Sequence, residues 1–525
     1  MVVRRVMGET MLLRGLLAIV TVLSGLLACW PLVRLWQAQR FSLRGYFRAL
    51  KGSPGVWLPW MIIWILLGVG ASFLTLAMPW LSAFIACMAL WILVIAAWTS
   101  HKLLPEPVTV KPPAARLLIL LVFLLYAQFE LLVPLAPDAG VGVLFIPLAL
   151  AALETTLAAV IMMPLEGAAQ AAVMRSAGKK IRSMPGLTVI GITGSAGKTG
   201  AGKLLEDMLA ARYAVLSAPD DADNGAPWII CRQLVRTHRV LLVEMRPDRR
   251  GYMKKMRRMA RPKLGVITAV GAASHMSEAQ VAAGSYEMIE AMDELGTAFF
   301  PSGSGYADML YRRCPLEKVR FGLENDGVCD ITAENLRLSG RGGSFTLTDR
   351  RSGESVHCRT RLLGRHNIRS ILAAAAVARK MGIDLATIAK CAEEAEPRGH
   401  FLHVEAGSEG RTLLLDGSAA APEGFMAALE VLRLFYTRKV VVVQVAGAFE
   451  DAGAREKLMK SVAETADLVI LCGLVGRALW KRGLTRAGLD AGKILEVPAL
   501  SGLRAHLDEL TEPGDTVLIE SADAW

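Results

Sequence analysis

The side chains best suited to chemistry lie together in one glycine-rich stretch, residues 187–199, which reads LTVIGITGSAGKT. A β-branched run leads into Gly191, Gly194 and Gly197, and Lys198 and Thr199 follow directly. Glycines let successive backbone N–H groups turn toward a polyphosphate, whose charge a following helix N-terminus also attracts. A lysine at this position reaches the β- and γ-phosphates, and the threonine hydroxyl can bind Mg²⁺. We therefore predict a nucleotide-binding loop whose contacts are Gly194, Ser195, Ala196, Gly197, Lys198 and Thr199.

Such a loop needs a strand before it and a helix after it. Residues 187–193 predict the strand, and residues 200–209, GAGKLLEDML, predict the helix. The strict pattern G-x-x-x-x-G-K-T is missed by one position, because Ile192 stands at its first glycine and the spacing is G-x-x-G-x-x-G-K-T. A strand-to-helix turn without a ligand is the alternative interpretation, but the Lys198–Thr199 pair disfavours it.

From residue 186 onward, short β-branched runs alternate with helical stretches, which is typical of a mostly parallel α/β sheet. Residues 240–244 and 264–270 read as buried strands, and residues 278–295 and 367–381 read as helices. A second α/β unit begins near residue 400, with strands predicted at 412–416, 440–446, 468–472, 494–497 and 516–519. We therefore expect an α/β protein with domains over residues 186–396 and 397–525.

The front of the chain has a different composition. The 525 residues are 53% hydrophobic, and the mean hydropathy of +0.40 is high for a soluble enzyme. About 20 apolar residues span a bilayer, and five runs meet that length: Leu16–Trp36, Trp57–Met78, Trp80–Trp98, Leu117–Leu135 and Val141–Met163. We predict a five-helix transmembrane domain over residues 1–165 and a juxtamembrane linker over residues 166–185. Glu130 and Glu154 lie inside these runs, and their role stays open.

Positive charge orients these spans. The first loop carries Arg40, Arg44, Arg48 and Lys51, and the third carries Lys102, Lys111 and Arg116, whereas the second and fourth lack both residue types. This pattern predicts a multi-pass protein of the cell membrane with its N-terminus outside and residues after about 165 in the cytoplasm. Arg4, Arg5 and Arg14 argue against that orientation.

The net charge of +11 favours a negatively charged partner. Much of the basic charge lies beside the predicted spans, which favours lipid headgroups or an anionic substrate over nucleic acid. Two further basic clusters occur at residues 246–261 and 341–361. The eight cysteines form no C-x-x-C pair, so neither a zinc site nor a disulfide framework is indicated.

The loop spacing G-x-x-G-x-x-G-K-T resembles the Mur ligase family, ATP-dependent enzymes that join an amine to a carboxylate. The resemblance covers residues 187–520 and is strongest in the central domain. Asn224-Gly-Ala-Pro227, the strand ending in Glu244, Thr268–His275 and the turn Leu363-Gly-Arg-His-Asn367 look like further family motifs. It implies a central P-loop ATPase domain over residues 186–396 and a C-terminal Rossmann-like domain over residues 397–525.

The resemblance also implies roles for residues outside the loop. Glu244 stands where the family has a Mg²⁺-binding glutamate, and His275 stands where it has a histidine near a second metal. His366 and Asn367 match a turn near the nucleotide base, and Asp416 matches an acidic residue that contacts ribose or phosphates. The implied catalytic set is Lys198, Glu244 and His275, the metal set is Thr199, Glu244 and His275, and the cofactors are ATP and Mg²⁺. Residue-level alternatives are an ion pair for Glu244 and a helix N-cap for Asn367.

Several positions depart from the family pattern. Ser285 stands in place of a lysine that the family modifies to a carbamate, and no lysine occurs between Lys263 and Lys318. The family's Thr-Asn-Val-Gly reads Thr268-Ala-Val-Gly here, its Asn-x-Asp reads Pro301-Ser-Gly303, and its Lys-Gly-Ser reads Glu520-Ser-Ala522. These changes weaken the expectation of a second metal and of the amine-substrate contacts.

The expected function is a membrane-bound ATP-dependent ligase that forms an amide through an acyl phosphate in cell-envelope or capsule polymer synthesis. Its partners would be ATP, an amino acid, a membrane-bound or polymeric carboxylate acceptor, membrane lipid and cell-envelope enzymes. Three alternatives stay open: a catalytically impaired, nucleotide-binding scaffold for cell-wall enzymes, a poly-γ-glutamate-type synthase, and an unrelated P-loop ATPase.

Overall fold

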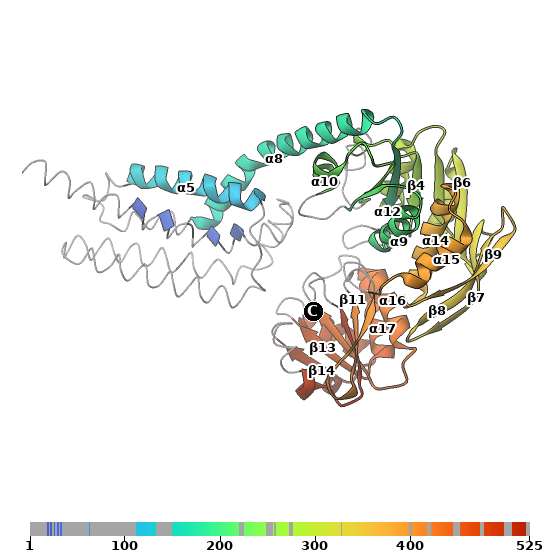
Figure 1. The fold of residues 1–525 in the computed structure, drawn as a ribbon. Coiled ribbons are helices and arrows are strands. Elements are labelled where there is room, and N and C mark those ends of the chain that lie inside the picture. Colours follow the sequence, from blue (N-terminus) through green and yellow to red (C-terminus); the bar gives the residue numbers. More distant parts are fainter. Residues whose placement is uncertain are drawn as a thin grey trace, which may run out of the picture. The chain divides into compact units, whose positions relative to one another are not determined.

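The computed structural model describes residues 112–132, 150–219, 225–247, 259–271, 277–326, 328–397, 402–416, 422–444, 452–472, 477–497 and 507–520, with single positions at 18, 19, 22, 23, 26, 29, 30, 32, 33, 62 and 256. The chain divides into two units, Met1–Ala172 and Val173–Trp525. Figure 1 shows the helices and strands of both, and each unit is described by itself.

The first unit contains α5, Pro112–Leu132, and the beginning of α8, Ala151–Arg182. Leu117 and Leu121 of α5 are buried in a small cluster with Ala158 and Ala159 of α8. Other apolar side chains of the same helices are exposed: Ile119, Phe123, Leu131, Leu153, Leu157, Val160 and Leu165. Many exposed apolar side chains on neighbouring turns are typical of helices that contact lipid or another protein.

Among the described residues, one helix has the length and apolar composition to cross a membrane, over Leu153–Arg182. It contains part of the fifth predicted span, and α5 covers most of the fourth. The first three predicted spans lie almost entirely outside the described residues. The five-helix transmembrane domain is therefore not confirmed and stays a prediction.

Most of the predicted linker, residues 166–185, is helical. It belongs to α8, which runs to Arg182 with Pro164 inside it. In the second unit, Ala177 and Ile181 of this helix are buried with Ile230 of α10, Gly225–Gln233. The end of α8 is thus part of a packed core rather than a free connection.

The nucleotide-binding strand lies inside a nine-stranded sheet with the order β2-β3-β1-β4-β5-β6-β7-β8-β9. Its strands are β1 (Thr188–Thr193), β2 (Val215–Ala218), β3 (Val240–Glu244), β4 (Leu264–Ile267), β5 (Thr297–Pro301), β6 (Glu317–Leu323), β7 (Ile331–Ser339), β8 (Gly342–Asp349) and β9 (Glu354–Thr360). Pairing is parallel from β2 to β7 and antiparallel from β7 to β9. The parallel part brings the carboxyl ends of β1, β3 and β4 to one edge.

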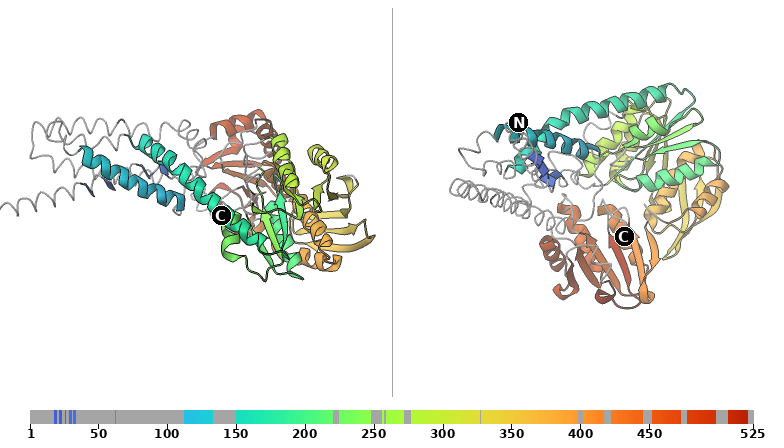
Figure 2. Two further views of the ribbon diagram at one scale, coloured as in Figure 1. Left: turned by 90° about the horizontal axis from the view of Figure 1, so that it is seen from above. Right: turned by 60° about the vertical axis from the view of Figure 1, so that its left-hand side comes forward.

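Helices cover both faces of this sheet (Figure 2). One cluster joins Ile190 and Ile192 of β1 to α9 (Lys198–Ala210), α14 (Arg365–Lys380) and α15 (Leu385–Glu394). The other joins Val189 of the same strand to α10, α12 (Glu278–Ala291) and α13 (Gly305–Arg313). Successive side chains of a strand point to opposite faces, so an apolar strand can serve both clusters.

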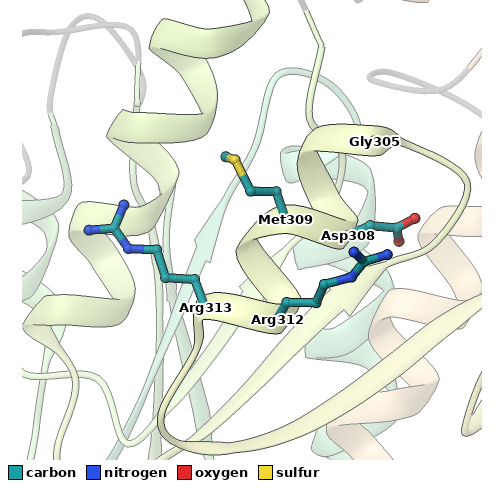
Figure 3. A pocket seen from close by; sticks show the side chains of 5 residues that line it. All are labelled: Gly305, Asp308, Met309, Arg312 and Arg313. Carbon is teal, nitrogen blue, oxygen red and sulfur yellow. The ribbon is translucent and has the colours of Figure 1, made fainter.

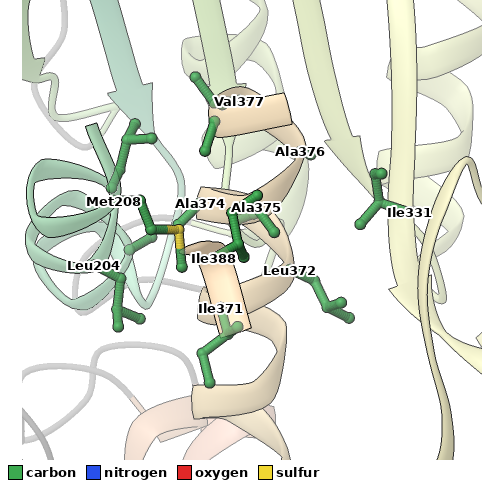
Figure 4. Close-up of a cluster of buried hydrophobic side chains, with 14 of the residues drawn as sticks. Leu204, Met208, Ile331, Ile371, Leu372, Ala374, Ala375, Ala376, Val377 and Ile388 are labelled. Carbon is green, nitrogen blue, oxygen red and sulfur yellow. The ribbon is translucent and has the colours of Figure 1, made fainter. Parts of the chain in front are cut away.

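The contact between α9 and α14 places the helix of the glycine loop against the centre of the domain. In Figure 4, Leu204 and Met208 of α9 lie beside Ile371, Ala374 and Ala375 of α14, and all five side chains are buried. The small alanine side chains let the α14 backbone approach its neighbours closely, so that the interior stays tightly packed.

The C-terminal part of the second unit has its own six-stranded sheet, in the order β10-β11-β15-β12-β13-β14. The strands are β10 (His403–Ala406), β11 (Thr412–Asp416), β12 (Lys439–Gln444), β13 (Leu468–Cys472), β14 (Ile494–Val497) and β15 (Thr516–Glu520), and the helices are α16 (Pro422–Leu432), α17 (Ala452–Thr465) and α18 (Arg477–Arg486). Within this six-stranded sheet, the β10–β11 pair is antiparallel and the other pairs are parallel. The α/β class with mostly parallel sheets is thereby confirmed.

Candidate functional site

The glycine loop joins the end of β1 to the start of α9. Gly194 and Gly197 have φ angles of 142° and 75°, which side chains with a Cβ adopt only under strain. A Cβ on Gly194 would lie 2.5 Å from Thr268 Oγ1. Gly197 is the residue before α9, and the helix begins at Lys198 rather than at Gly200 as the sequence predicted. The glycines therefore set a loop conformation that exposes the helix N-terminus.

Lys198 lies over this loop. Its ammonium donates to the carbonyl oxygen of Gly194 at 2.6 Å and to that of Ser195 at 3.4 Å. An ammonium is a compact point charge with three donors on a flexible stem. It can therefore exchange carbonyl oxygens for phosphate oxygens without a change in the backbone.

Thr199 and Glu244 meet at the edge of the sheet. The Thr199 hydroxyl donates to Glu244 Oε2 at 3.1 Å, and the Glu244 residue is 8% exposed. The pairing of β1 with β3 places Ile192 opposite Glu244, and Met245 N–H donates to the Ile192 carbonyl at 2.7 Å. A hydroxyl and a carboxylate, both oxygen ligands of the kind that Mg²⁺ prefers, thus stand side by side next to the glycine loop.

Thr268, which sequence reasoning did not select, holds the loop from the other side. It follows β4, and its hydroxyl lies 2.6 Å from the Ala196 carbonyl and 3.2 Å from the Thr193 carbonyl. Ser195 N–H donates to the Ala269 carbonyl at 3.0 Å. The signal was present in the sequence, because Thr268 opens the Thr-Ala-Val-Gly motif, but only the structure shows which atoms it contacts.

The start of α14 lies close to the same loop. Gly364, with a φ of 82°, precedes this helix, and the buried Asn367 donates to the Leu363 carbonyl at 2.8 Å. Ser370 donates to the His366 carbonyl, and its hydroxyl would lie 3.2 Å from a Cβ on Gly197. Asn367 thus closes the turn that resembles the family's nucleotide-base motif, while its side-chain oxygen has no bond to the turn.

His366, at the start of α14, lies close enough to Asp416, at the end of β11, to feel its charge. Burial lowers the pKa of His366 below 6.5, and the negative charge of Asp416, at the end of β11, opposes this shift. The Nδ1 atom of His366 is buried and has no hydrogen-bond partner among the described residues. Leu363 packs in the same cluster as Leu414 and Val431 of the C-terminal part. The segment that begins α14 is therefore one place where the two parts meet.

Other predicted features fall outside the described residues. His275, Asn224, the stretch 417–421 and most of Gly447–Gly453 belong to this group, so their expected roles stay predictions. Ser285 is described: it lies in α12, it is fully buried, and its hydroxyl has no partner among the described residues. No three His, Cys, Asp or Glu side chains of the described segments gather into a metal-binding group.

A shallow pocket lies elsewhere, along α13 (Figure 3). Its lining residues are Gly305, Asp308, Met309, Arg312 and Arg313. Asp308 forms an ion pair with Arg320, so its carboxylate is already engaged. The pocket contains none of the predicted site residues.

Comparison with known proteins places this geometry in context. Residues 192–378 match the model of the Mur ligase middle domain. The chain is 28% identical over 372 residues to the UDP-N-acetylmuramoyl-tripeptide--D-alanyl-D-alanine ligase of Mycobacterium bovis, covering 65% of this chain and 71% of that protein. It is 26% identical to the enzyme of the same name from Treponema pallidum over 356 residues, covering 65% and 73%.

Solved structures of similar fold include MurF from Acinetobacter baumannii, with a TM-score of 0.59, 20% identity, and coverage of 67% of this chain and 77% of that one. MurF ligase from Thermotoga maritima in complex with ADP has a TM-score of 0.56 and 20% identity, covering 66% and 79%. At this identity the structural likeness establishes the fold alone.

Proposed function

Residues 192–378 make this chain a divergent member of the Mur ligase family, and from that premise we propose that it is an ATP-dependent ligase that joins an amine to a carboxylate. The observation that carries the proposal is the Thr199–Glu244 pair, 3.1 Å apart, beside the Lys198 ammonium and the glycine loop. This is the set of groups that phosphoryl transfer needs, since its catalysis depends on positioning and charge neutralisation.

The reaction would proceed in two steps. A carboxylate oxygen of the acceptor attacks the γ-phosphorus of ATP, which gives an acyl phosphate and ADP. The amine then attacks the acyl carbon, phosphate leaves with the former carboxylate oxygen, and the amine loses a proton to form the amide. Lys198 and the N–H groups of the loop would neutralise the charge that develops on the transferred phosphoryl group.

The residues present fit one Mg²⁺ ion. Thr199 and Glu244 would hold it, and a bound Mg²⁺ supplies charge neutralisation and alignment of the phosphates. The expected second-metal contact, His275, stays a prediction. Ser285 offers a buried hydroxyl where the resemblance expects a carbamate, so this position contributes no acidic ligand.

We further propose that the acceptor is membrane-bound or polymeric, in cell-envelope or capsule polymer synthesis, and that the protein is a multi-pass membrane protein with cytoplasmic catalytic domains. The apolar helix over Leu153–Arg182 supports the membrane location. The names of the relatives suggest a nucleotide-linked muramoyl peptide and D-alanyl-D-alanine as a substrate pair to test first. A poly-γ-glutamate-type substrate is the next class.

The experiment is a product assay with the full-length protein in detergent or nanodiscs. Mg-ATP is supplied with UDP-N-acetylmuramoyl-tripeptide and D-alanyl-D-alanine, and then with lipid-linked or polymeric carboxylates and single amino acids. We expect ADP release and an amide product for one pair. Glu244→Ala should abolish the product and only weaken nucleotide binding, whereas the exposed Glu290→Ala on α12 should match the parent. Product formation by Glu244→Ala at the parental rate would contradict the proposal.

Ser285 also favours a second candidate, a nucleotide-binding scaffold for cell-wall enzymes, because a buried hydroxyl replaces the expected lysine. The two candidates differ in a deletion strain. A scaffold tolerates both Lys198→Ala and Glu244→Ala, provided that the protein still reaches the membrane. Loss of rescue by both variants would exclude a scaffold that needs no nucleotide chemistry.

A further inference from the structure

We propose that the end of α8 together with α10 forms a surface that binds anionic lipid headgroups, so that the ATP-binding domain itself lies against the membrane. This inference rests on the membrane location proposed above and adds a specific lipid-binding face. The face comprises residues 173–187 and 225–239.

The first observation is charge. The segment 173–187 contains four basic residues and the segment 225–239 contains three, and neither contains an Asp or Glu. Lys179, Arg232, Arg236 and Arg239 are exposed, and no ion pair joins them to another described residue. Elsewhere in the domain, exposed arginines such as Arg350 and Arg351 have carboxylate partners. The lack of acidic residues within these two segments favours an anionic partner.

The second observation is that the two segments form one packed surface. Lys180 donates to the Cys231 carbonyl at 2.7 Å, and the Cys231 thiol lies 3.6 Å from the Val173 carbonyl. Ala177 and Ile181 of α8 share a buried cluster with Ile230 and Leu234. The basic residues of the two segments therefore lie on one packed part of the domain.

The third observation selects a bilayer over a polyanion in solution. Trp228 and Val235 are 51% and 50% exposed on the same segment as the arginines. Trp228 lies one helical turn before Arg232 on α10, so both point to the same side. Exposed tryptophan beside cationic residues is the pattern of the membrane–water interface, where the ring lies at headgroup level.

The sequence of α8 supports the same occupant. An apolar run of this helix ends at Leu165, and Arg175, Lys179, Lys180 and Arg182 follow within the same helix. Basic residues at the end of such a stretch meet the anionic headgroups of the cytoplasmic leaflet.

The test uses the full-length protein in nanodiscs with the photo-crosslinking residue p-benzoyl-phenylalanine in place of Trp228. Nanodiscs contain either phosphatidylglycerol with phosphatidylcholine or phosphatidylcholine alone, and adducts are identified by mass spectrometry. A matched control carries the residue in place of Tyr436, which is fully exposed in the C-terminal part. We expect phosphatidylglycerol adducts at position 228 and none at position 436.

A second variant tests the charges. The triple variant Lys179→Gln, Arg232→Gln, Arg236→Gln should lower the adduct yield at position 228 by well over fivefold, because the loss of one basic residue near an anionic surface already has roughly a fivefold effect. ATP binding should stay at the parental level, which shows that the domain is folded.

Three results would overturn the inference: no lipid adduct at position 228, equal lipid adducts at positions 228 and 436, or an adduct to another polypeptide. Extraction of the protein from native membranes with alkaline carbonate separates this failure from that of the membrane location. A protein that resists carbonate but gives no adduct refutes the lipid-binding face alone. Because the readout is a lipid adduct, it does not depend on ligase activity.

Discussion

Lys198 is the side chain whose removal tests nucleotide binding most simply. Its ammonium contacts two carbonyl oxygens of the loop and would contact phosphate oxygens in their place. A hydrogen bond to a charged group contributes about 1.5–3 kcal/mol, so Lys198→Ala should weaken Mg-ATP binding by about 10- to 150-fold in calorimetry. Lys203→Ala, on the exposed side of α9, is the control. Equal affinity of the two variants would refute the predicted role of the loop.

His366 predicts a dependence of stability on pH. Burial lowers its pKa from 6.5, with Asp416 opposing, so the unfolded chain takes up a proton in this range while the folded chain stays neutral. The contribution of neutral His366 to the free energy of unfolding is fully present above pH 6.5. It decreases as pH falls, by at most about 1.4 kcal/mol per pH unit. The drop in Tm between pH 7.5 and 5.5 should therefore be smaller for His366→Gln than for the parent. The exposed His357→Gln should show the parental drop, and an unchanged drop in His366→Gln would contradict the burial argument.

At the scale of elements, the hydroxyl of Thr268 joins the end of β4 to the glycine loop. Thr268→Val keeps the shape but leaves the half-buried Ala196 carbonyl without this donor, which costs about 1–3 kcal/mol. We expect nucleotide affinity to fall by about fivefold or more, and Thr268→Ser to retain the parental value.

Thr348 of β8 offers a matched control for this change. Its hydroxyl is buried without a partner among the described residues, so Thr348→Val leaves no carbonyl without a donor. Nucleotide affinity in Thr348→Val should equal that of the parent. If Thr268→Val also binds nucleotide like the parent, the hydroxyl does not position the loop.

The sequence predicted the parallel strands well because each is a short run rich in apolar residues, and most of them, though not the edge strand β14, are buried on both faces. The predicted ranges 240–244, 412–416, 468–472 and 494–497 coincide with β3, β11, β13 and β14. Helix α12 is shorter than predicted: a capping box of Ser277 and Gln280 starts it, and it ends at Ala291. The residue types at Ser277 and Gln280 predict where this helix begins, whereas its end depends on tertiary packing.

The antiparallel strands β7–β9 were not predicted from the sequence. Their exposed face carries arginines, such as Arg337 and Arg359, so the segment reads as a basic cluster. One face of these three strands packs against α14 and α15. The apolar residues on that face occur at every second position, and polar or charged residues lie between them. Burial on one face alone gives a weaker signal than the continuous apolar runs of the parallel strands.

For the candidate site, the sequence predicted the loop and the adjacency of Thr199 to Glu244, because both follow neighbouring parallel strands. It did not predict which groups hold the loop, since Thr268 lies about 70 residues away along the chain and is brought near only by the sheet order. The approach of Asp416 to His366 likewise depends on how the turn before α14 packs against the C-terminal part.

At the scale of the whole molecule, the charges of the loops predict the topology. A reporter fused after Trp525 should be cytoplasmic, and one inserted within residues 137–142 should be external, because the basic loops stay inside. Activity of alkaline phosphatase and fluorescence of a cytoplasmic reporter distinguish the two sides. The reverse pattern would place the nucleotide site away from cytoplasmic ATP and would contradict the proposed function.

The most direct measurement of carboxylate activation follows one oxygen atom. The full-length protein receives Mg-ATP, an amine and an acceptor whose carboxylate carries ¹⁸O, and the released phosphate is analysed by mass spectrometry. An acyl phosphate transfers one acceptor oxygen to phosphate when the amine displaces it, so we expect phosphate that contains one ¹⁸O for each amide formed. Released phosphate without ¹⁸O would show that ATP is hydrolysed without carboxylate activation, and it would contradict the ligase mechanism.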